Sequence, residues 1–428
     1  MTAEIAVMNR IGVALAADSA VTISAAQKIY TSANKLFQLS ASAPVGVMIY
    51  GNASFVNMPW ETIIKAFRKQ NGTRTFGSLE EYCSAFLAFL THNTALFPES
   101  TQIGQLEQLL ASLFIAIREE IGRQLDLLAE SNENGDLSVD DISEAIDGIV
   151  ERWDERIKKH DLIEGIADSD REKAKSKLKE SIEGLRVEAF GELPFSERAI
   201  ETLNALAIES WARTFLSHQK SGFVLAGFGE NEYLPSLVAF EFEEMFEGIP
   251  RRKLFNRQRI DDDTDACIIP FAQKDPVQQF LEGIDQRQFS AMKRSAREAI
   301  SSPIETILEV IAQTDANLAN VIQGVVRPEI EELTKQLFDA WEMLKKDQWE
   351  PVLDTVAVLP KDELAAMSEA LVNLTKFKRR VTPEQETVGG PIDVAVITKG
   401  DGFVWLKRKH YFDPTLNPRI MARYQEAQ

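Results

Sequence analysis

The chain has 428 residues, of which 44% are hydrophobic and 26% are charged, a balance typical of a globular protein with a large core. Its formal net charge of −19 opposes contact with polyphosphates, so we expect neither nucleic acid nor an anionic membrane as a partner. No apolar run reaches the ~20 residues of a membrane span, and the start lacks the pattern of a secretion signal. We therefore expect a cytoplasmic protein. Its two cysteines and four histidines are scattered and predict no disulfide or metal site.

The first elements are short strands. Residues 4–7 and 12–17 are apolar runs separated by the turn-like "MNRI", which predicts a β-hairpin. The segments "QKIYTSANKLFQLS" and "PVGVMIYGN" are two further strand candidates, and the second ends at Gly51. From there to about residue 218 the apolar residues recur at helical spacing, with one long helix predicted over 102–129.

Strands return later in the chain. Residues 221–242 read as two strands joined by a polar turn, and an apolar run, "ACIIPFA", precedes a helix that begins near Pro276. Residues 286–380 are again helical in pattern, and "GGPIDVAVITKGDGFVWLKRK" closes the chain with two strands. We interpret the basic runs at 251–259 and 376–380 as solvated loops or helix ends. Three strand groups separated by helices predict an α+β fold.

Thr2 is the first candidate functional residue. A hydroxyl nucleophile needs a base, and the α-amino group of an N-terminal threonine supplies one, with an ordinary pKa of ~7.7–8.0. Thr2 is small enough for an aminopeptidase to remove Met1. The alternative is an ordinary N-terminus, because many unrelated proteins begin with Met-Thr.

Three further residues extend this hypothesis. Asp18 follows the second predicted strand, and Lys35 lies on the next strand pair, so the lysine ammonium could lie beside the threonine hydroxyl with the carboxylate orienting it. Gly51 offers a backbone N–H that no side chain obstructs, a candidate oxyanion donor. Alternatively, Asp18 caps a turn, Lys35 is a solvated strand residue and Gly51 merely ends a strand.

The order of Thr2, "GVALAADS", "NKLFQL" and "YGNAS" resembles the N-terminal half of proteasome β-type subunits and the related bacterial ATP-dependent protease subunit, in the N-terminal nucleophile hydrolase superfamily. The resemblance extends to 219–285 and 362–408, about half of the chain in all. It implies a four-layer αββα sandwich, no cofactor, and catalytic roles for Thr2, Asp18, Lys35 and Gly51.

The sequence departs from the family pattern around this site. The family has a basic residue where this chain has Ala20, a Gly-Ser-Gly loop where it has "FAQKDP", and a serine where it has Val388. Residues that could support the site are Ser19, Asp275 and Glu386, with Glu384 as the alternative to Glu386 for an aspartate that the family has before the last hairpin. By alignment, the residues nearest the primary substrate pocket are mostly apolar, which hints at cleavage after hydrophobic residues: Val21, Ala33, Phe37, Ile49 and Ala53.

The resemblance also implies a domain organisation with two helical insertions. The expected segments are 1–93 for the N-terminal core, 94–197 for the first insertion, 198–286 for the central strands, 287–360 for the second insertion, and 361–428 for the C-terminal core and tail. Such insertions could cap the site, alter ring packing or bind a regulatory partner.

The segment "ESNENGDLSVDD" approximates a calcium-binding loop. Its candidate ligands are Glu130, Asn132, Asn134 and Asp141. The aspartate at the last position is shorter than the usual glutamate, and we favour a polar connection between helices in which Ser138 caps the second helix.

Three functions are consistent with these observations. The first is a threonine peptidase acting on peptides or proteins, assembled as a homo-oligomer that could be a ring. The second is a catalytically inactive proteasome-like scaffold that binds partners through its helical insertions, which the departures around the site favour. The third is a small-molecule amidase that uses the same nucleophile.

Overall fold

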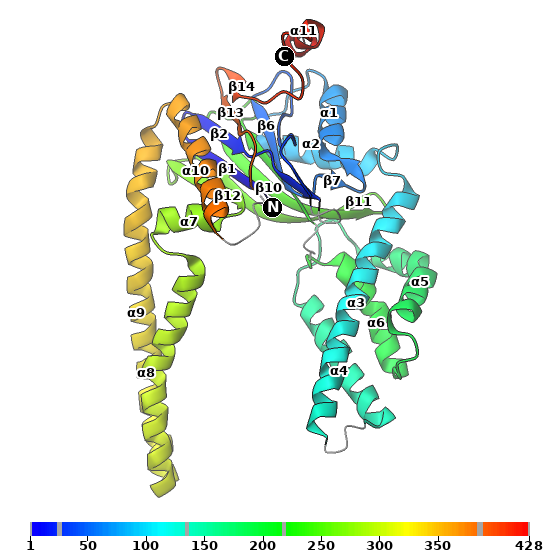
Figure 1. Ribbon diagram of the computed structural model, residues 1–428, viewed down its shortest axis with the longest axis vertical. Helices are drawn as coiled ribbons and strands as arrows, with labels where there is room; N and C mark the ends of the chain where they lie inside the picture. Colours follow the sequence, from blue (N-terminus) through cyan, green and yellow to red (C-terminus); the bar gives the residue numbers. More distant parts are fainter. Residues whose placement is uncertain (1, 24–27, 133–136, 216–219, 383–387, 427–428) are drawn as a thin grey trace. The chain divides into compact units, whose positions relative to one another are not determined.

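The computed structural model of the protein describes residues 2–23, 28–132, 137–215, 220–382 and 388–426 (Figure 1). The chain folds into two compact units that interleave in sequence. The first contains residues up to 36, 233–235 and those from 259 onward, and the second contains 37–232 and 236–258. Each unit contains an antiparallel sheet and long helices, which confirms the predicted α+β class.

The first unit is organised around a five-stranded sheet with the order β12-β1-β2-β13-β14. All four neighbouring pairs are antiparallel. The predicted N-terminal hairpin and the predicted C-terminal strand pair are both present, and β2 joins them by pairing with β13. The strands are β1 (Ala3–Asn9), β2 (Gly12–Ala17), β12 (Ala266–Ala272), β13 (Asp393–Thr398) and β14 (Gly402–Lys407); a separate ribbon pairs β3 (Val21–Ile23) with β4 (Lys28–Tyr30).

The helices of the first unit cover one face of this sheet. Ala3, Ile5 and Val7 of β1 share an apolar core with Val356 and Leu364, which belong to α9 and α10. In Figure 1, α8 and α9 run side by side as a long helical hairpin. The helices are α7 (Asp275–Glu282), α8 (Gln286–Thr314), α9 (Ala316–Val358), α10 (Lys361–Val381) and α11 (Pro418–Glu426).

Asn9 fastens the end of the hairpin helix α9 to the sheet. Its side-chain amide is fully buried and donates hydrogen bonds to the carbonyls of Val356 and Leu359, both at 2.9 Å, while its oxygen accepts from the backbone N–H of Ile11. These bonds satisfy carbonyl groups that the end of a helix leaves without intrahelical partners.

Replacing Asn9 with alanine should destabilise the protein by about 2 kcal/mol, because buried carbonyls lose their donor. Chemical denaturation of the wild-type and variant proteins would measure the difference. Asn71→Ala, which removes an exposed hydrogen bond to the Arg74 carbonyl, is the control and should change the free energy of unfolding by less than about 0.5 kcal/mol. Equal stability of the two variants would contradict the role of Asn9.

The second unit has a sheet with the order β11-β10-β9-β6-β5, in which β9 pairs antiparallel with both β6 and β10. The helices α1 and α2 pack on it through an aromatic core that includes Trp60, Phe86 and Phe223. Its elements are β5 (Leu36–Gln38), β6 (Val45–Gly51), β7 (Ser54–Phe55), β8 (Met58–Pro59), β9 (Ser221–Gly227), β10 (Ser236–Phe246), β11 (Ile249–Arg259), α1 (Trp60–Asn71) and α2 (Leu79–His92).

Four further helices of the second unit form a bundle with its own apolar core (Figure 1). They are α3 (Glu99–Ser131), α4 (Val139–Lys158), α5 (Asp168–Phe190) and α6 (Glu197–Ala212). The predicted long helix at 102–129 is therefore confirmed, and the helical block extends to Ala212 because α6 shares the core of the other three helices.

One sequence interpretation was wrong. The basic run 251–259 is neither a loop nor a helix end but most of strand β11. Arg251, fully buried, explains how a charged run enters the sheet: its guanidinium forms ion pairs with Glu243 and Glu244 and donates to the carbonyl of Trp211 at the end of α6. Buried charge is tolerated where partners of opposite charge and carbonyl acceptors surround it. The other basic run, 376–380, lies at the end of α10 as expected.

Candidate active site

Asp18 anchors the candidate site in the first unit. It follows β2 directly and its side chain is fully buried. One carboxylate oxygen accepts hydrogen bonds from the backbone N–H of Ala3 (3.1 Å) and from Lys35 Nζ (2.5 Å). The other accepts from the N–H groups of Ala20 (3.2 Å) and Gly389 (2.8 Å). Four donors from separate segments of the chain therefore fix the position of this carboxylate.

Lys35 is the cation of the site, and only 5% of its surface is exposed. Its Nζ lies 2.5 Å from Asp18 Oδ1 and 3.4 Å from Glu4 Oε1. A buried ammonium group is stable only where carboxylates and hydrogen-bond acceptors offset the loss of water. The structure thus places Asp18 and Lys35 together, as the sequence predicted, and adds a second carboxyl group.

Thr2 directly precedes β1 and is 3% exposed. Its hydroxyl oxygen is buried and makes no hydrogen bond of good geometry with any residue that the structure describes. Buried hydroxyl groups normally have a partner, so one without a partner calls for a functional or structural reason. A nucleophilic hydroxyl must be free to donate to a neighbouring base, and none of the described residues holds the Thr2 hydroxyl in a hydrogen bond of good geometry.

Glu4 is the residue that the sequence analysis missed. Because side chains alternate along a strand and Ala3, Ile5 and Val7 pack in the core with α10, Glu4 points to the opposite face of the sheet, as does Thr2 two residues earlier. Its carboxyl is fully buried, and neither oxygen has a hydrogen-bond partner of good geometry among the described residues. A single acidic residue within an otherwise apolar strand was the signal that could have identified it.

Burial raises the pKa of the Glu4 carboxyl to about 8. The nearby charge of Asp18 acts in the same direction, whereas the Lys35 ammonium and the Thr2 side chain lower the pKa. Thr2 is thus near enough to stabilise the ionised form of Glu4 even without a hydrogen bond of good geometry. A carboxyl with this pKa exchanges its proton close to neutral pH, as general acids and bases do.

The residues predicted to support the site have varied positions. Ser19 is buried, and its hydroxyl donates to the Pro391 carbonyl at 2.5 Å, which ties the segment before β13 to the end of β2. Asp275 is the first residue of α7 and pairs with Arg287 at 3.4 Å. Glu384 and Glu386 lie outside the described residues. Ser19 therefore holds the backbone of the segment before β13 near Asp18, whereas Asp275 forms its ion pair with a residue of α8.

The departures from the family pattern have structural counterparts. Val388 is fully buried and belongs to the apolar core beneath the sheet, where it offers no polar atom. Gln273, 5% exposed, accepts a hydrogen bond from Arg379 Nε at 2.6 Å. Neither of these two positions provides the serine hydroxyl that the family resemblance implies there.

Gly51 belongs to the second unit, where it ends β6. Its φ is +76°, and a Cβ atom at this position would lie 2.5 Å from the Lys220 carbonyl oxygen. Only glycine fits this conformation and this close approach. Its role as an oxyanion donor stays a prediction.

The predicted substrate-pocket residues are divided between the units. Val21 and Ala33 belong to the first unit and are partly exposed. Phe37 and Ile49 pack in the aromatic core of the second unit, whereas Ala53 is exposed. The pocket and the preference for hydrophobic residues stay predictions.

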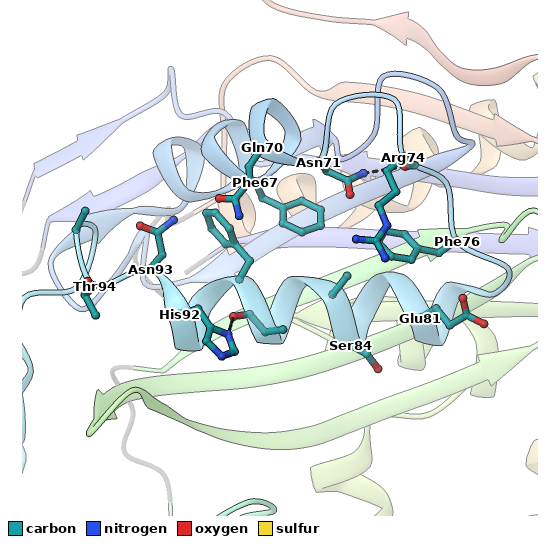
Figure 2. A pocket seen from close by; sticks show the side chains of 14 residues that line it. Phe67, Gln70, Asn71, Arg74, Phe76, Glu81, Ser84, His92, Asn93 and Thr94 are labelled. Atoms are coloured by element: carbon teal, nitrogen blue, oxygen red, sulfur yellow. Dashed lines mark hydrogen bonds between the residues drawn. The ribbon is translucent and has the colours of Figure 1, made fainter.

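A cavity of about 870 Å³ lies between α1 and α2 of the second unit (Figure 2). Phe67 and Phe89 line it together with polar groups, including His92, whose Nδ1 lies 2.7 Å from the Ala88 carbonyl oxygen. At one end, Arg74 stacks over Phe76. None of the four residues Thr2, Glu4, Asp18 and Lys35 lines this cavity. We therefore do not assign the candidate active site to it.

The calcium-loop hypothesis is only partly covered by the structure, because Asn134 lies outside the described residues. Glu130 and Asn132 lie at the end of α3, and Asp141 is in the first turn of α4. The Asp141 carboxylate accepts from the N–H and hydroxyl of Ser138, while Ser138 caps the helix in return. This capping box confirms that Ser138 caps the second helix. Within the described ranges, no group of three His, Cys, Asp or Glu residues could hold a metal ion.

A buried hydroxyl, a lysine fixed by an aspartate and a proton-exchanging carboxyl are the components of a hydroxyl-nucleophile site.

Neither a protein-family model nor a curated protein sequence matches the chain. None of the described helices is apolar over a length that would cross a membrane.

Similar solved structures include two Anbu proteins. A mutant Anbu from Hyphomicrobium sp. strain MC1 is 11% identical, with a TM-score of 0.31, and the match covers 100% of this chain and 96% of that one. Anbu from Yersinia bercovieri, described as an ancestral beta-subunit, is 10% identical, with a TM-score of 0.30 and coverage of 99% and 97%. At these TM-scores the likeness supports no conclusion about the fold or the activity of this chain.

Proposed function

We propose that the protein is an N-terminal threonine hydrolase, a proteasome-like peptidase that hydrolyses peptide bonds through an acyl-enzyme on Thr2 after removal of Met1. The observation that carries this proposal is the cluster in the first unit: Lys35 Nζ lies between Asp18 and Glu4, and the buried hydroxyl of Thr2 is on the same face as Glu4. The sequence resemblance to proteasome β-type subunits supports the same assignment.

The proposed reaction begins with attack of Thr2 Oγ1 on a peptide carbonyl. The Lys35 ammonium stabilises negative charge that develops on the oxygen nucleophile, and Asp18 holds this ammonium in position. The N–H of Gly51 is the proposed donor to the carbonyl oxygen as it becomes an oxyanion. The α-amine that removal of Met1 frees can accept the hydroxyl proton and, through water, deliver it to the leaving nitrogen. The tetrahedral intermediate collapses to an ester on Thr2, the amine product leaves, and water hydrolyses the ester, which restores the Thr2 hydroxyl.

A catalytically inactive scaffold is the second candidate function. Ala20, Gln273 and Val388 favour it, because all three replace residues that the family uses around the nucleophile. In that case the helical hairpin and the helical bundle would serve to bind partners. Hydrolysis of small-molecule amides would use the same nucleophile, and substrate profiling would distinguish it from peptide hydrolysis.

Covalent labelling tests the proposal. N-terminal sequencing of the purified protein should begin at Thr2, and a peptide boronate or epoxyketone should modify that residue, as shown by mass spectrometry. Thr2→Ala should abolish both labelling and turnover, since removal of a nucleophile typically lowers kcat by several orders of magnitude. Thr22→Ala, at a threonine elsewhere in the first unit, is the control and should be labelled. Complete retention of Met1 would favour the scaffold.

Cytoplasmic location and homo-oligomeric assembly, in a ring or otherwise, belong to the same proposal. Light scattering of the purified protein measures the oligomeric state. A monomer that is labelled at Thr2 would separate the chemistry from the assembly.

A further inference from the structure

We propose that Glu4 is the proton-transfer carboxyl of this site, accepting the hydroxyl proton of Thr2 and delivering it to the leaving nitrogen. This inference rests on the proposed function, because it assigns a role within the same reaction. It assigns a role to Glu4, the second carboxyl of the cluster. The arrangement of Thr2, Asp18 and Lys35 does not by itself account for this carboxyl.

The position of Glu4 is the first argument. It follows Thr2 by two residues, so both side chains lie on the face of the sheet opposite the core shared with α10. Its Oε1 lies 3.4 Å from Lys35 Nζ, and the Thr2 side chain is close enough to stabilise the carboxylate form. Glu4 therefore contacts the cation of the site and adjoins its nucleophile.

The incomplete hydrogen bonding of Glu4 is the second argument. Asp18 accepts four hydrogen bonds and is committed to holding Lys35 and the surrounding backbone. Glu4, although equally buried, has no hydrogen-bond partner of good geometry for either oxygen among the described residues. A buried carboxyl is costly to leave without hydrogen bonds, so its retention here needs an explanation.

The side chains at two positions where the family resemblance implies support for the site are the third argument. The position at which the family resemblance implies a serine that supports the α-amine is Val388, which packs in the apolar core. Gln273 is engaged by Arg379. A site with weaker support for proton transfer through the amine gains most from a carboxyl beside the hydroxyl.

The proton balance is complete within the site. Thr2 Oγ1 forms a bond to the carbonyl carbon while its proton passes to a Glu4 oxygen, and the π electrons of the carbonyl move to its oxygen. As the intermediate collapses, the C–N bond breaks and Glu4 returns the proton to the nitrogen. In the second half of the reaction, the same carboxylate accepts a proton from the water that attacks the ester. The C–Oγ1 bond then breaks, and Glu4 returns this proton to Thr2 Oγ1.

The charged groups around Glu4 define the expected pH dependence. Its cross-strand neighbours, Phe271 of β12 and Ala17 of β2, carry no charge, and Lys35 and Asp18 are the charged groups that act on it. The α-amine that removal of Met1 would create also titrates near pH 8. Because the pKa of Glu4 is raised to about 8, the ionised, proton-accepting form increases as the pH rises toward 8. A variant without this carboxyl keeps only the titration of the amine.

The test compares rates of Thr2 acylation by a peptide β-lactone across pH 6 to 9.5, followed by mass spectrometry. In the wild type the rate should rise with pH to a plateau above pH 8. Glu4→Gln should be acylated about 100-fold more slowly at pH 8, and Glu4→Asp should recover part of that loss. Glu244→Gln is the matched control: it removes another buried carboxyl whose pKa burial raises to about 8, and its rate and profile should equal those of the wild type.

The outcomes separate the two proposals. If Thr2→Ala blocks acylation but Glu4→Gln keeps the rate and pH profile of the wild type, the role of Glu4 is wrong and the hydrolase proposal stands. If the wild type shows no Thr2-dependent acylation, both are wrong. A second measurement is independent of the folding of the glutamine variant: the carboxyl ¹³C resonance of Glu4 in the wild type, assigned with Glu4→Asp, should titrate near pH 8. A midpoint below pH 6 would overturn the inference.

Discussion

Lys35→Met should lower the free energy of unfolding by about 3–5 kcal/mol and abolish labelling of Thr2. The lysine is the cation of a buried cluster, and its removal leaves Asp18 without a countercharge at a position with no exposed surface. Removing one partner of a buried ion pair costs far more stability than replacing both partners with apolar residues, because it leaves a buried charge without a countercharge. Guanidinium denaturation followed by circular dichroism measures the stability, and the epoxyketone assay measures labelling.

A surface lysine gives the matched control. Lys65 pairs with Glu61 one helical turn away on α1, at 2.5 Å, but the lysine side chain is 52% exposed. Lys65→Met should therefore change stability by less than about 1 kcal/mol. The double variant Lys35→Met, Asp18→Asn should recover much of the lost stability but none of the labelling, because it removes both charges. If Lys35→Met were as stable as Lys65→Met, the ion pair with Asp18 would have no structural importance.

Glu4→Gln should become more stable relative to the wild type as the pH rises. Burial raises the pKa of Glu4 from 4.5 to about 8 in the folded protein, so the folded state keeps this proton over a range in which the unfolded chain has lost it. Below pH 4.5 both states are protonated, and the stability that the raised pKa provides is fully present. It is lost as the pH rises from 4.5 through 8, and glutamine does not titrate.

The free energy of unfolding of Glu4→Gln relative to that of the wild type should rise by about 4 kcal/mol between pH 4 and pH 9. Thermal or guanidinium unfolding at a series of pH values, with both proteins in the same buffers, measures it. A constant difference between Glu4→Gln and the wild type over this range would show that Glu4 is ionised in the folded protein at neutral pH.

The two experiments on Glu4 address different properties. The stability measurement reports whether the carboxyl holds its proton near neutral pH, and the acylation kinetics report whether that proton moves during the reaction. A carboxyl that is protonated but has no effect on acylation would be a structural feature of the sheet. The stability result would then stand while the further inference failed.

Much of the fold could be predicted from local pattern. The N-terminal hairpin, the strand ending at Gly51, the strand pairs near 221–242 and 393–407, and the long helix at 102–129 all appear where the apolar spacing indicated. The strands are short apolar runs between turn residues and the helix has apolar residues at a period of 3.6, and both patterns are visible in a short window of sequence. Strand β11 was missed because its charged residues break that pattern, and the partners that allow it, among them Glu243, become neighbours of Arg251 only in the folded sheet.

The candidate site, like the fold, could be predicted only in part from the sequence. The residue types and their order along the chain were enough to select Thr2, Asp18 and Lys35, because a nucleophile at the N-terminus, a carboxylate after a strand and a nearby lysine are local features. The pairing of Asp18 with Lys35 at 2.5 Å agrees with that selection. Gly51 was selected for its lack of a side chain, and its positive φ shows that the chain requires glycine there.

Tertiary structure alone decided the environment of these residues. The sequence places an acidic residue in the strand that follows Thr2, but only burial between β12 and β2, with Lys35 3.4 Å away, gives Glu4 a pKa near neutral pH. Likewise, only the packing of Val388 in the core shows that this position offers no polar group. Desolvation and the distance between charges depend on segments far apart in the chain. The sequence therefore identified Thr2, Asp18 and Lys35 as candidate groups, whereas the tertiary structure revealed Glu4 and determined the partners of all four.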